Sequence, residues 1–331
     1  MLPLFKMELS TLNYEKFIEE KIAELAINRA PLELYEPIRY ILSLGGKRLR
    51  PQLIFISNSL FEENIEDCAY AALAVELFHN FTLIHDDIMD NAPLRRGKAT
   101  VHEKWNVNTG ILSGDTMLVV AFAQINKIKS PRIREIYDVF NITAIEVCEG
   151  QQFDMNYETQ EQVSVEDYLE MIRLKTAVLL GGSLKIGAII GNASFADGQK
   201  IYAFGENLGM GFQLMDDYLD VYGDPEKFGK QIGGDIISNK KTYLLLNALQ
   251  MCNAQDKAEL LKWIEAKEFS TEEKVKAVTA IYDRCGVKEL SAKKMQEYYD
   301  KAYQYLGEID VPEYKKLQLK TFADMVSKRA K

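Results

Sequence analysis

Apolar residues recur at helical spacing, three or four positions apart, along most of the chain. The stretch 66–90 is apolar nearly all round, which is typical of a helix that is buried on every side. The stretch 13–30 has one apolar side and therefore predicts an amphipathic helix. Similar patterns predict further helices over 133–155, 165–189, 198–223 and, with more charge, 240–330.

Alternating runs of β-branched residues between turn pairs are missing from the sequence, so we expect no sheet. No linker rich in proline, glycine or serine separates two halves, and only 8 prolines occur in 331 residues. We therefore expect the all-α fold class, with one helical domain that spans residues 1–331.

The composition is typical of a globular protein, with 47% hydrophobic and 27% charged residues. The net charge of −9 argues against a nucleic-acid partner, because nucleic-acid binders present a basic face. Anionic substrates are still compatible with it, since a local basic cluster can outweigh a distant acidic surface.

The four cysteines are scattered without metal-like spacing, which favours reduced thiols. The N-terminus lacks the pattern of a signal peptide, and no uncharged apolar run is long enough to span a bilayer. The sequence thus predicts a cytoplasmic protein without a membrane span.

Two aspartate clusters, DDIMD (86–90) and DDYLD (216–220), share the spacing i, i+1, i+4. On a helix the first and last aspartate of each cluster lie on one face, where their like charges repel. A divalent cation would relieve this repulsion, and Mg²⁺ prefers one or two carboxylates together with phosphate oxygens. A single cluster could equally be a solvated helix end. Two copies, each followed by a basic loop, favour metal binding by Asp86, Asp87, Asp90, Asp216, Asp217 and Asp220.

The motif GGKRLRP (45–51) supplies Lys47, Arg48 and Arg50 beside two glycines, and Arg95 and Arg96 follow the first aspartate cluster. Arginine suits bidentate phosphate binding, and lysine acts as a point charge. His79 precedes the cluster by about two turns and could be a ligand-binding residue or a plain core histidine. The sequence thus predicts a metal-dependent and a metal-free anion site, as an enzyme that joins two diphosphates would need.

In order along residues 40–245, the motifs GGKRLRP, HDDIMDNAPLRRGKATVH, RLKTAVLL, GMGFQLMDDYLDVYGD and GKQIGGDIISNKKTYLL resemble those of the trans-isoprenyl diphosphate synthases, or polyprenyl synthetases. The resemblance implies a helical bundle around a deep central cavity, a homodimer, and Mg²⁺ as cofactor. It implies head-to-tail condensation of isopentenyl diphosphate with an allylic diphosphate (dimethylallyl, geranyl or farnesyl).

The resemblance also assigns roles to individual residues. Both aspartate clusters would hold Mg²⁺ at the allylic diphosphate, and Thr176 and Gln213 would direct oxygen dipoles at the carbocation. Gln151 and Asp154 match a supporting position in the cavity. The allylic diphosphate would contact Arg95, Lys175, Lys230 and Lys240, and isopentenyl diphosphate would contact Lys47, Arg50, His79 and Arg96.

Phe81 lies five residues before Asp86, which is about 7.5 Å along a helix axis. The side chain could be core packing, or it could be the floor that stops a growing prenyl chain. The resemblance favours the floor, and the small Thr82 beside it favours a twenty-carbon product over a fifteen-carbon one.

Two other functions remain open from the sequence. A terpene cyclase or diphosphate lyase of the same fold is expected to lack GGKRLRP and the second aspartate cluster. A non-catalytic subunit of a heteromeric synthase is expected to have lost aspartates from one cluster. Both clusters and the basic motif are intact here, which favours the synthase.

Overall fold

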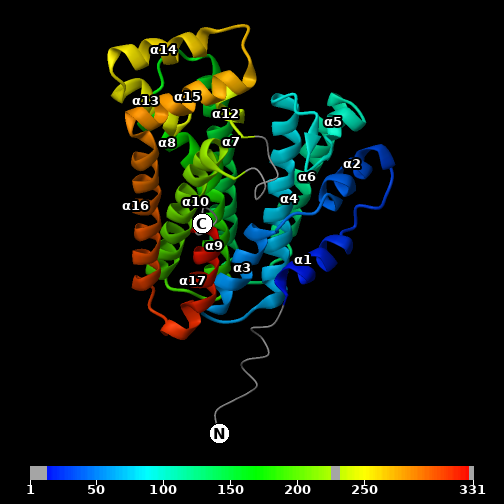
Figure 1. The fold of residues 1–331 in the computed structure, drawn as a ribbon. Helices are drawn as coiled ribbons and strands as arrows, with labels where there is room; N and C mark the ends of the chain where they lie inside the picture. Colours follow the sequence, from blue (N-terminus) through cyan, green and yellow to red (C-terminus); the bar gives the residue numbers. More distant parts are fainter. Residues whose placement is uncertain (1–12, 225–231, 328–331) are drawn as a thin grey trace. The chain divides into compact units, whose positions relative to one another are not determined.

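The computed structural model describes residues 13–224 and 232–327 of the chain. Within these ranges every long element is a helix, which confirms the predicted all-α fold (Figure 1). The chain forms two compact units. Unit 1 comprises residues 1–141 and 183–198, and unit 2 comprises residues 142–182 and 199–331.

Unit 1 is built on α4 (Ile65–Met89), which matches the predicted apolar helix to within one residue at each end. Asn64 caps its N-terminus, because the Asn64 side chain accepts a hydrogen bond from the amide of Asp67 at 3.1 Å. Helices α3 and α6 pack against α4. The other helices of this unit are α1 (Tyr14–Ala23), α2 (Leu32–Ser43), α3 (Leu49–Ser59), α5 (Val101–Lys104) and α6 (Val107–Ile125), with the start of α7 (Ile133–Thr159) and the end of α9 (Val178–Ile190).

Two details of unit 1 differ from the sequence prediction. The N-terminal helix ends at Ala23 and does not continue to residue 30; beyond it the amide of Ile27 bonds to the carbonyl of Leu25 at 2.8 Å, and Ile27 is buried. A small antiparallel ribbon, β1 (Leu94–Arg95) and β2 (Lys98–Ala99), is present although no sheet was expected. It is too short to show an alternating pattern, and the left-handed backbone of Arg96 and Gly97 forms its turn.

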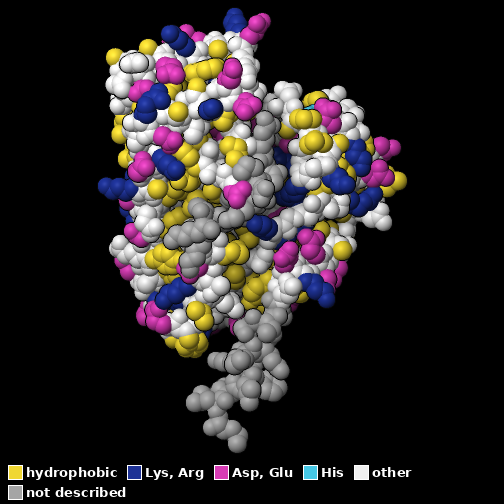
Figure 2. Space-filling view, in the orientation of Figure 1, with side chains coloured by type: hydrophobic (Ala, Val, Ile, Leu, Met, Phe, Trp, Pro, Cys, Tyr) yellow, Lys and Arg dark blue, Asp and Glu magenta, His cyan; other side chains and the backbone are white. Residues whose placement is uncertain are grey.

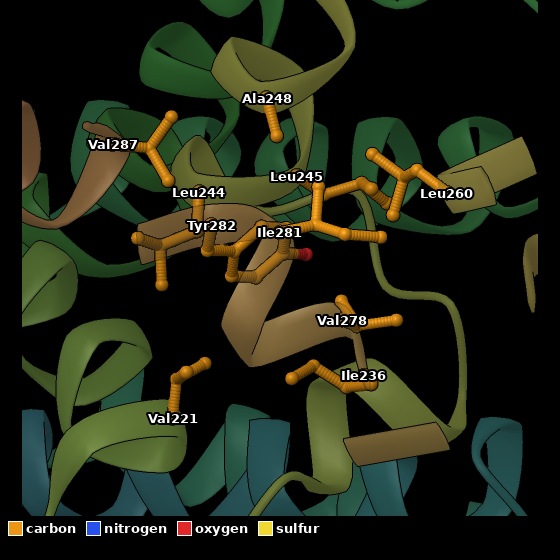
Figure 3. Close-up of a cluster of buried hydrophobic side chains, with 10 residues drawn as sticks. All are labelled: Val221, Ile236, Leu244, Leu245, Ala248, Leu260, Val278, Ile281, Tyr282 and Val287. Carbon is orange, nitrogen blue, oxygen red and sulfur yellow. The ribbon is translucent and has the colours of Figure 1, made fainter. Parts of the chain in front are cut away.

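Unit 2 has a core formed where its smaller helices meet (Figure 3). Leu244 and Leu245 of α13 pack there with Ile281 of α15 and Ile236 of α12, and all four are at most 5% exposed. The helices of this unit are the rest of α7, α8 (Val165–Ile172), the π-helix η3 (Arg173–Ala177), the start of α9, most of α10 (Phe195–Tyr222), α12 (Gly234–Ile237), α13 (Tyr243–Met251), α14 (Ala254–Glu265), α15 (Thr271–Cys285), α16 (Val287–Glu308) and α17 (Glu313–Ser327).

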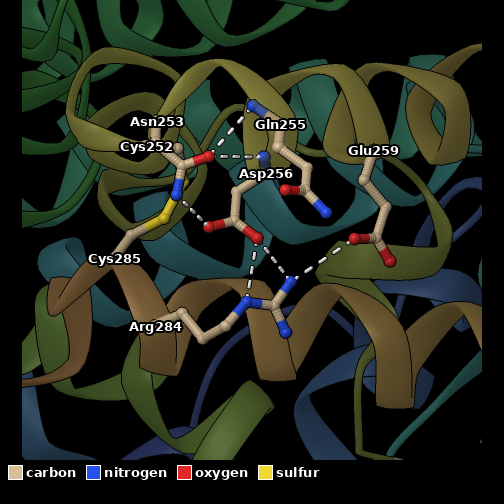
Figure 4. The surroundings of a disulfide bond; sticks show 7 residues. All are labelled: Cys252, Asn253, Gln255, Asp256, Glu259, Arg284 and Cys285. Atoms are coloured by element: carbon tan, nitrogen blue, oxygen red, sulfur yellow. Dashed lines mark hydrogen bonds and ion pairs between the residues drawn. A yellow bond between two sulfur atoms is a disulfide. The ribbon is translucent and has the colours of Figure 1, made fainter.

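Cys252 and Cys285 form a disulfide in unit 2, so the prediction of four reduced thiols is wrong for this pair (Figure 4). The two residues are 33 positions apart, yet the packing of α13, α14 and α15 brings their Cα atoms to 5.2 Å. Next to the bond, Arg284 donates to Oδ1 of Asp256 at 2.8 and 2.6 Å. The other two cysteines, Cys68 and Cys148, take no part in a disulfide.

No helix in the described ranges combines the length and the apolar composition that crossing a membrane requires. Acidic and basic side chains are interspersed over the face drawn in Figure 2.

Candidate active site

The first aspartate cluster occupies the last turn of α4 in unit 1. The amide of Asp90 bonds to the carbonyl of Asp86 at 2.8 Å, so the helix reaches the end of the cluster. Asp86 is half-buried and Asp90 is exposed, whereas Asp87 is 1% exposed. Asp87 accepts two hydrogen bonds from Arg95, at 2.8 Å from Nε and 2.7 Å from Nη2. The acid and the base that adjoin in the sequence thus form a bidentate pair.

Arg48 of the GGKRLRP motif faces the interior of unit 1. Its backbone is left-handed, with φ of 45°, and the residue is 3% exposed. The guanidinium pairs with Glu76 at 2.5 Å and with Glu19 at 2.7 Å, and it also donates to the carbonyl of Leu42 at 2.6 Å. Arg48 therefore anchors the loop, while Lys47 on the same loop is exposed.

The charges of the motif arginines act on His79. Arg50 Nη1 lies 3.3 Å from His79 Nε2. Gly46 has φ of 142°, and a Cβ there would lie 2.9 Å from Nη1 of Arg96, so the glycine lets this arginine approach the loop. Burial lowers the pKa of His79 well below 6.5, and the charges of the nearby arginines 50, 96, 95 and 48 lower it further. The resulting site has a neutral histidine within a strongly positive field, which suits an anion.

Phe81 is 8% exposed on α4 and belongs to an aromatic cluster. Its ring centroid lies 4.8 Å from that of His85 and 5.7 Å from that of Phe78. The adjacent residue, Thr82, is small, and its hydroxyl donates to the carbonyl of His79 at 2.8 Å. Phe81 thus has the packing of a core residue, and this packing would also hold it rigidly as a floor.

In unit 2, six residues predicted from the sequence line one cavity of about 50 Å³. Three further residues, Tyr168, Met171 and Ile172, complete the lining and were not predicted. Tyr168 precedes Lys175 by seven positions, so two turns of helix place both on the same face, and this spacing could have indicated it. The six predicted residues are Asp154, Lys175, Thr176, Gln213, Asp217 and Lys240.

Lys175 and Thr176 lie on the π-helix η3, a form that is frequent at functional sites. The π-helix passes close to Gly150 of α7. A Cβ at Gly150 would overlap the backbone nitrogen of Lys175 and lie 2.7 Å from the carbonyl carbon of Leu174. The ammonium of Lys175 pairs with Asp154 at 2.6 Å. Gly150 therefore allows α7 to place Asp154 beside Lys175.

A chain of hydrogen bonds runs through the cavity. The hydroxyl of Thr176 donates to Oε1 of Gln213 at 3.2 Å, and the amide nitrogen of Gln213 donates to Oδ1 of Asp217 at 3.2 Å. Tyr168 donates to the other carboxylate oxygen of Asp217. Burial raises the pKa of Asp217 to about 7, with Asp235 as the second cause, and the Tyr168 hydrogen bond and Lys240 oppose this shift.

The second aspartate cluster lies on the last turns of α10, and its three members have different environments. Asp216 is exposed and Asp217 is buried in the cavity. Asp220 accepts a hydrogen bond from the amide of Asp235 at 2.9 Å, and its backbone carbonyl accepts one from Gly233 at 2.6 Å. Asp220 thus fixes the start of α12, a structural role that its spacing did not indicate.

Of the two further residues predicted for this site, Gln151 and Lys230, only Gln151 lies within the described residues. Gln151 is half-buried on α7, and the lining residues do not include it. Lys230 lies outside the described residues.

The donor atoms suit a hard cation. Among residues 13–224 and 232–327, no three His, Cys, Asp or Glu side chains are arranged to hold a metal ion by themselves. Asp86 and Asp90 nevertheless offer carboxylate oxygens one turn apart at an accessible helix end. Mg²⁺ fits this set, because it commonly binds one or two carboxylates and completes its shell with water and phosphate oxygens.

The helical fold carries carboxylates and basic groups that would suit an anionic substrate and a divalent cation. The polyprenyl synthetase family model matches residues 31–282, so the chain belongs to the polyprenyl synthetase family. As a member it is a prenyltransferase of isoprenoid biosynthesis, and the resemblance stated from its motifs is confirmed.

Known relatives cover nearly the whole chain. Geranylgeranyl diphosphate synthase of Methanosarcina mazei is 38% identical over 295 residues, which are 87% of this chain and 89% of that protein. A crystal structure of a geranylgeranyl pyrophosphate synthase is 42% identical, with a TM-score of 0.89 over 100% of both chains. That of the Corynebacterium glutamicum enzyme, complexed with isoprenyl diphosphate and magnesium, is 26% identical, with a TM-score of 0.84 over 96% of this chain and 98% of that one.

Proposed function

We propose that this chain is a Mg²⁺-dependent geranylgeranyl diphosphate synthase. It condenses isopentenyl diphosphate head-to-tail with an allylic diphosphate (dimethylallyl, geranyl or farnesyl) to give a twenty-carbon product. The observation that carries the proposal is the cavity of unit 2, where Lys175, Thr176, Gln213 and Lys240 meet around Asp217. The names of the relatives support the product length.

In the proposed reaction each group of side chains has a separate task. Bound Mg²⁺ supplies the positive charge that makes the allylic diphosphate a better leaving group. Lys175 and Lys240 contribute fixed positive charge to the same diphosphate as its C–O bond breaks. Because Asp217 holds the amide nitrogen of Gln213, the carbonyl oxygen of Gln213 is directed toward Thr176. These oxygens stabilise the allylic cation.

The basic cluster of unit 1 holds the second substrate. Arg50, Arg96 and Lys47 bind the diphosphate of isopentenyl diphosphate by charge alone, without activating it as a leaving group. His79 stays neutral beside Arg50 and can donate or accept a hydrogen bond there. Binding both substrates to one protein makes carbon–carbon coupling effectively intramolecular. The released diphosphate then accepts the proton that the new chain loses, since no side chain in the motifs is an evident general base.

We also propose that residues 1–331 form a single isoprenoid synthase domain around a deep central cavity, and that two copies form a homodimer in the cytoplasm. The family match over residues 31–282 supports the single domain. Support for the dimer comes from exposed apolar side chains along α6, where Leu112 is 59% and Val119 is 68% exposed. Sedimentation equilibrium should give twice the chain mass of 37.8 kDa.

Diphosphate release tests the reaction class. With Mg²⁺, release should require both isopentenyl diphosphate and an allylic diphosphate, and it should stop when the metal is chelated. Release from the allylic diphosphate alone would instead indicate a cyclase or lyase. A lack of release with every primer would favour a non-catalytic subunit.

A further inference from the structure

A buried lysine outside the family motifs holds the segment that carries Lys240. Lys274 of α15 is 1% exposed, and burial lowers its pKa. Its ammonium donates to the side-chain oxygen of Asn239 at 2.7 Å and to the carbonyl of Ile237 at 3.4 Å, and it lies 4.1 Å from the ring centroid of Phe269. Burying an ammonium is costly unless it is hydrogen-bonded, so these bonds fix the position of the segment against α15.

Asn239 connects this lysine to a second helix. Its backbone is left-handed, with φ of 54°, a conformation that asparagine tolerates better than most residues. The amide nitrogen of its side chain donates to the carbonyl of Ile264, the next-to-last residue of α14, at 3.0 Å. We call the contacts of Asn239 with Lys274 and Ile264 the Asn239 clamp. The clamp ties the residue before Lys240 to both α14 and α15.

The other end of the same segment is fixed by the second aspartate cluster. Asp220 bonds to the amides of Gly233 and Asp235, which start α12. Ile236 of α12 points into the hydrophobic core of unit 2 beside Val278 of α15 (Figure 3). Between the two fixed ends, the amide of Lys240 donates to the carbonyl of Asp235 at 2.9 Å.

These contacts form a continuous path from Lys274 to the cavity, because Lys240 lines it together with Asp217 and Lys175. We propose that Lys274 is a positioning residue for the reaction: through the Asn239 clamp it sets where the ammonium of Lys240 lies. The proposal rests on the proposed function for the role of Lys240 at the allylic diphosphate. Lys274 itself touches no reacting atom.

The primary variant is Lys274→Met, which keeps the length of the side chain and removes the ammonium. We expect its kcat/KM for the allylic diphosphate to fall about 10- to 100-fold, because small displacements of a positioned group are costly. The KM for isopentenyl diphosphate should stay unchanged. Asn239→Gly is the second variant, since glycine keeps the left-handed backbone while removing the clamp, and it should give the same pattern.

A double-mutant cycle separates positioning from a general loss of stability. In a Lys240→Ala background, adding Lys274→Met should lower kcat/KM by less than about threefold, because the group that Lys274 positions is already gone. The matched control is Lys316→Met. Lys316 is 2% exposed and donates to Gly307 and Glu313 at 2.8 Å on α16 and α17. The Lys316→Met variant should have a lower melting temperature, with the KM values for both substrates unchanged.

Amide hydrogen exchange tests the clamp without any substrate. In Lys274→Met the amides of Asn239 and Lys240 should exchange faster than in the wild type, while Lys316→Met should leave them unchanged. Unchanged exchange, or losses of kcat/KM that multiply fully in the double mutant, would overturn the inference. If the wild-type chain makes no product longer than its primer, the proposed function is refuted. The hydrogen-exchange result would still decide whether the clamp exists.

Discussion

The hydroxyl of Tyr168 on α8 donates a hydrogen bond to the carboxylate of Asp217 on α10, and both side chains are buried in unit 2. This bond partly offsets the burial that raises the pKa of Asp217 from 3.8 to about 7. Without the bond, the ionised carboxylate would be less stable in the folded protein. The pair thus links the hydrogen bonding of the cavity to the pH dependence of the fold.

We predict that Tyr168→Phe extends the pH range over which stability is lost. The folded state binds a proton at Asp217 more tightly than the unfolded state does. The contribution of Asp217 to the stability of the folded protein is therefore fully present below pH 3.8 and is lost as the pH rises through about 7. Removing the hydroxyl raises the pKa further, so the loss should continue to higher pH. Melting temperatures of the wild type and the variant from pH 5 to pH 9, without metal, measure this loss of stability.

Tyr303→Phe is the control for this prediction, because Tyr303 makes a similar hydrogen bond to Asp324 on α17. It should leave the titration attributed to Asp217 in place. Identical pH profiles for the wild type and Tyr168→Phe would show that the hydroxyl does not influence Asp217.

Gly150→Ala should disrupt the π-helix that carries Lys175 and Thr176. The added methyl group would overlap the backbone of η3, which cannot move away as a flexible side chain could. We expect kcat to fall about 100-fold, because both residues would be displaced from the cavity. Gly307→Ala is the control, since a Cβ there meets nothing within 4 Å, and it should stabilise the protein by about 0.4–1 kcal/mol. Wild-type kcat in Gly150→Ala would contradict this account of η3.

The two neighbouring arginines of the basic motif should respond differently to substitution. Arg48→Met leaves Glu76 buried without its charged partner, so it should lower the free energy of unfolding by about 3–5 kcal/mol. Arg50→Met should instead raise the KM for isopentenyl diphosphate about tenfold or more, through loss of charge-assisted hydrogen bonds. Urea unfolding and steady-state kinetics on both variants measure this. Similar effects from both substitutions would show that the loop does not divide these tasks.

Phe81→Ala should lengthen the product. Removing the ring opens space about 7.5 Å below the first aspartate cluster, where a growing prenyl chain is expected to run. The control is Phe55→Ala, because Phe55 is also buried, yet it packs against Tyr14 and Phe17 instead. Each change should cost about 3–5 kcal/mol of stability. Reversed-phase chromatography of the products should show longer chains for Phe81→Ala alone, and unchanged lengths would refute the floor.

The sequence predicted α4 and α10 to within a few residues at each end, because each is a long run rich in apolar residues at helical spacing. Six of the residues that line the cavity lie in motifs of the sequence, and the roles of most of them follow from the resemblance of these motifs to the family. The sequence could not indicate which arginine turns inward, because that depends on the left-handed backbone of Arg48.

The remaining features depend on contacts between distant segments. The bond between Cys252 and Cys285 requires three helices to pack first. The capping role of Asp220 requires α12 to fold back onto α10, and the Asn239 clamp requires α15 to lie beside α12. Such pairings have no signature in the spacing of either segment.

The most direct test of the proposed synthase is to size the product that the wild-type chain makes from isopentenyl diphosphate and farnesyl diphosphate with Mg²⁺. The account predicts a twenty-carbon prenyl diphosphate as the main product, and no product once the metal is chelated. Diphosphate release without a chain longer than the primer would contradict it.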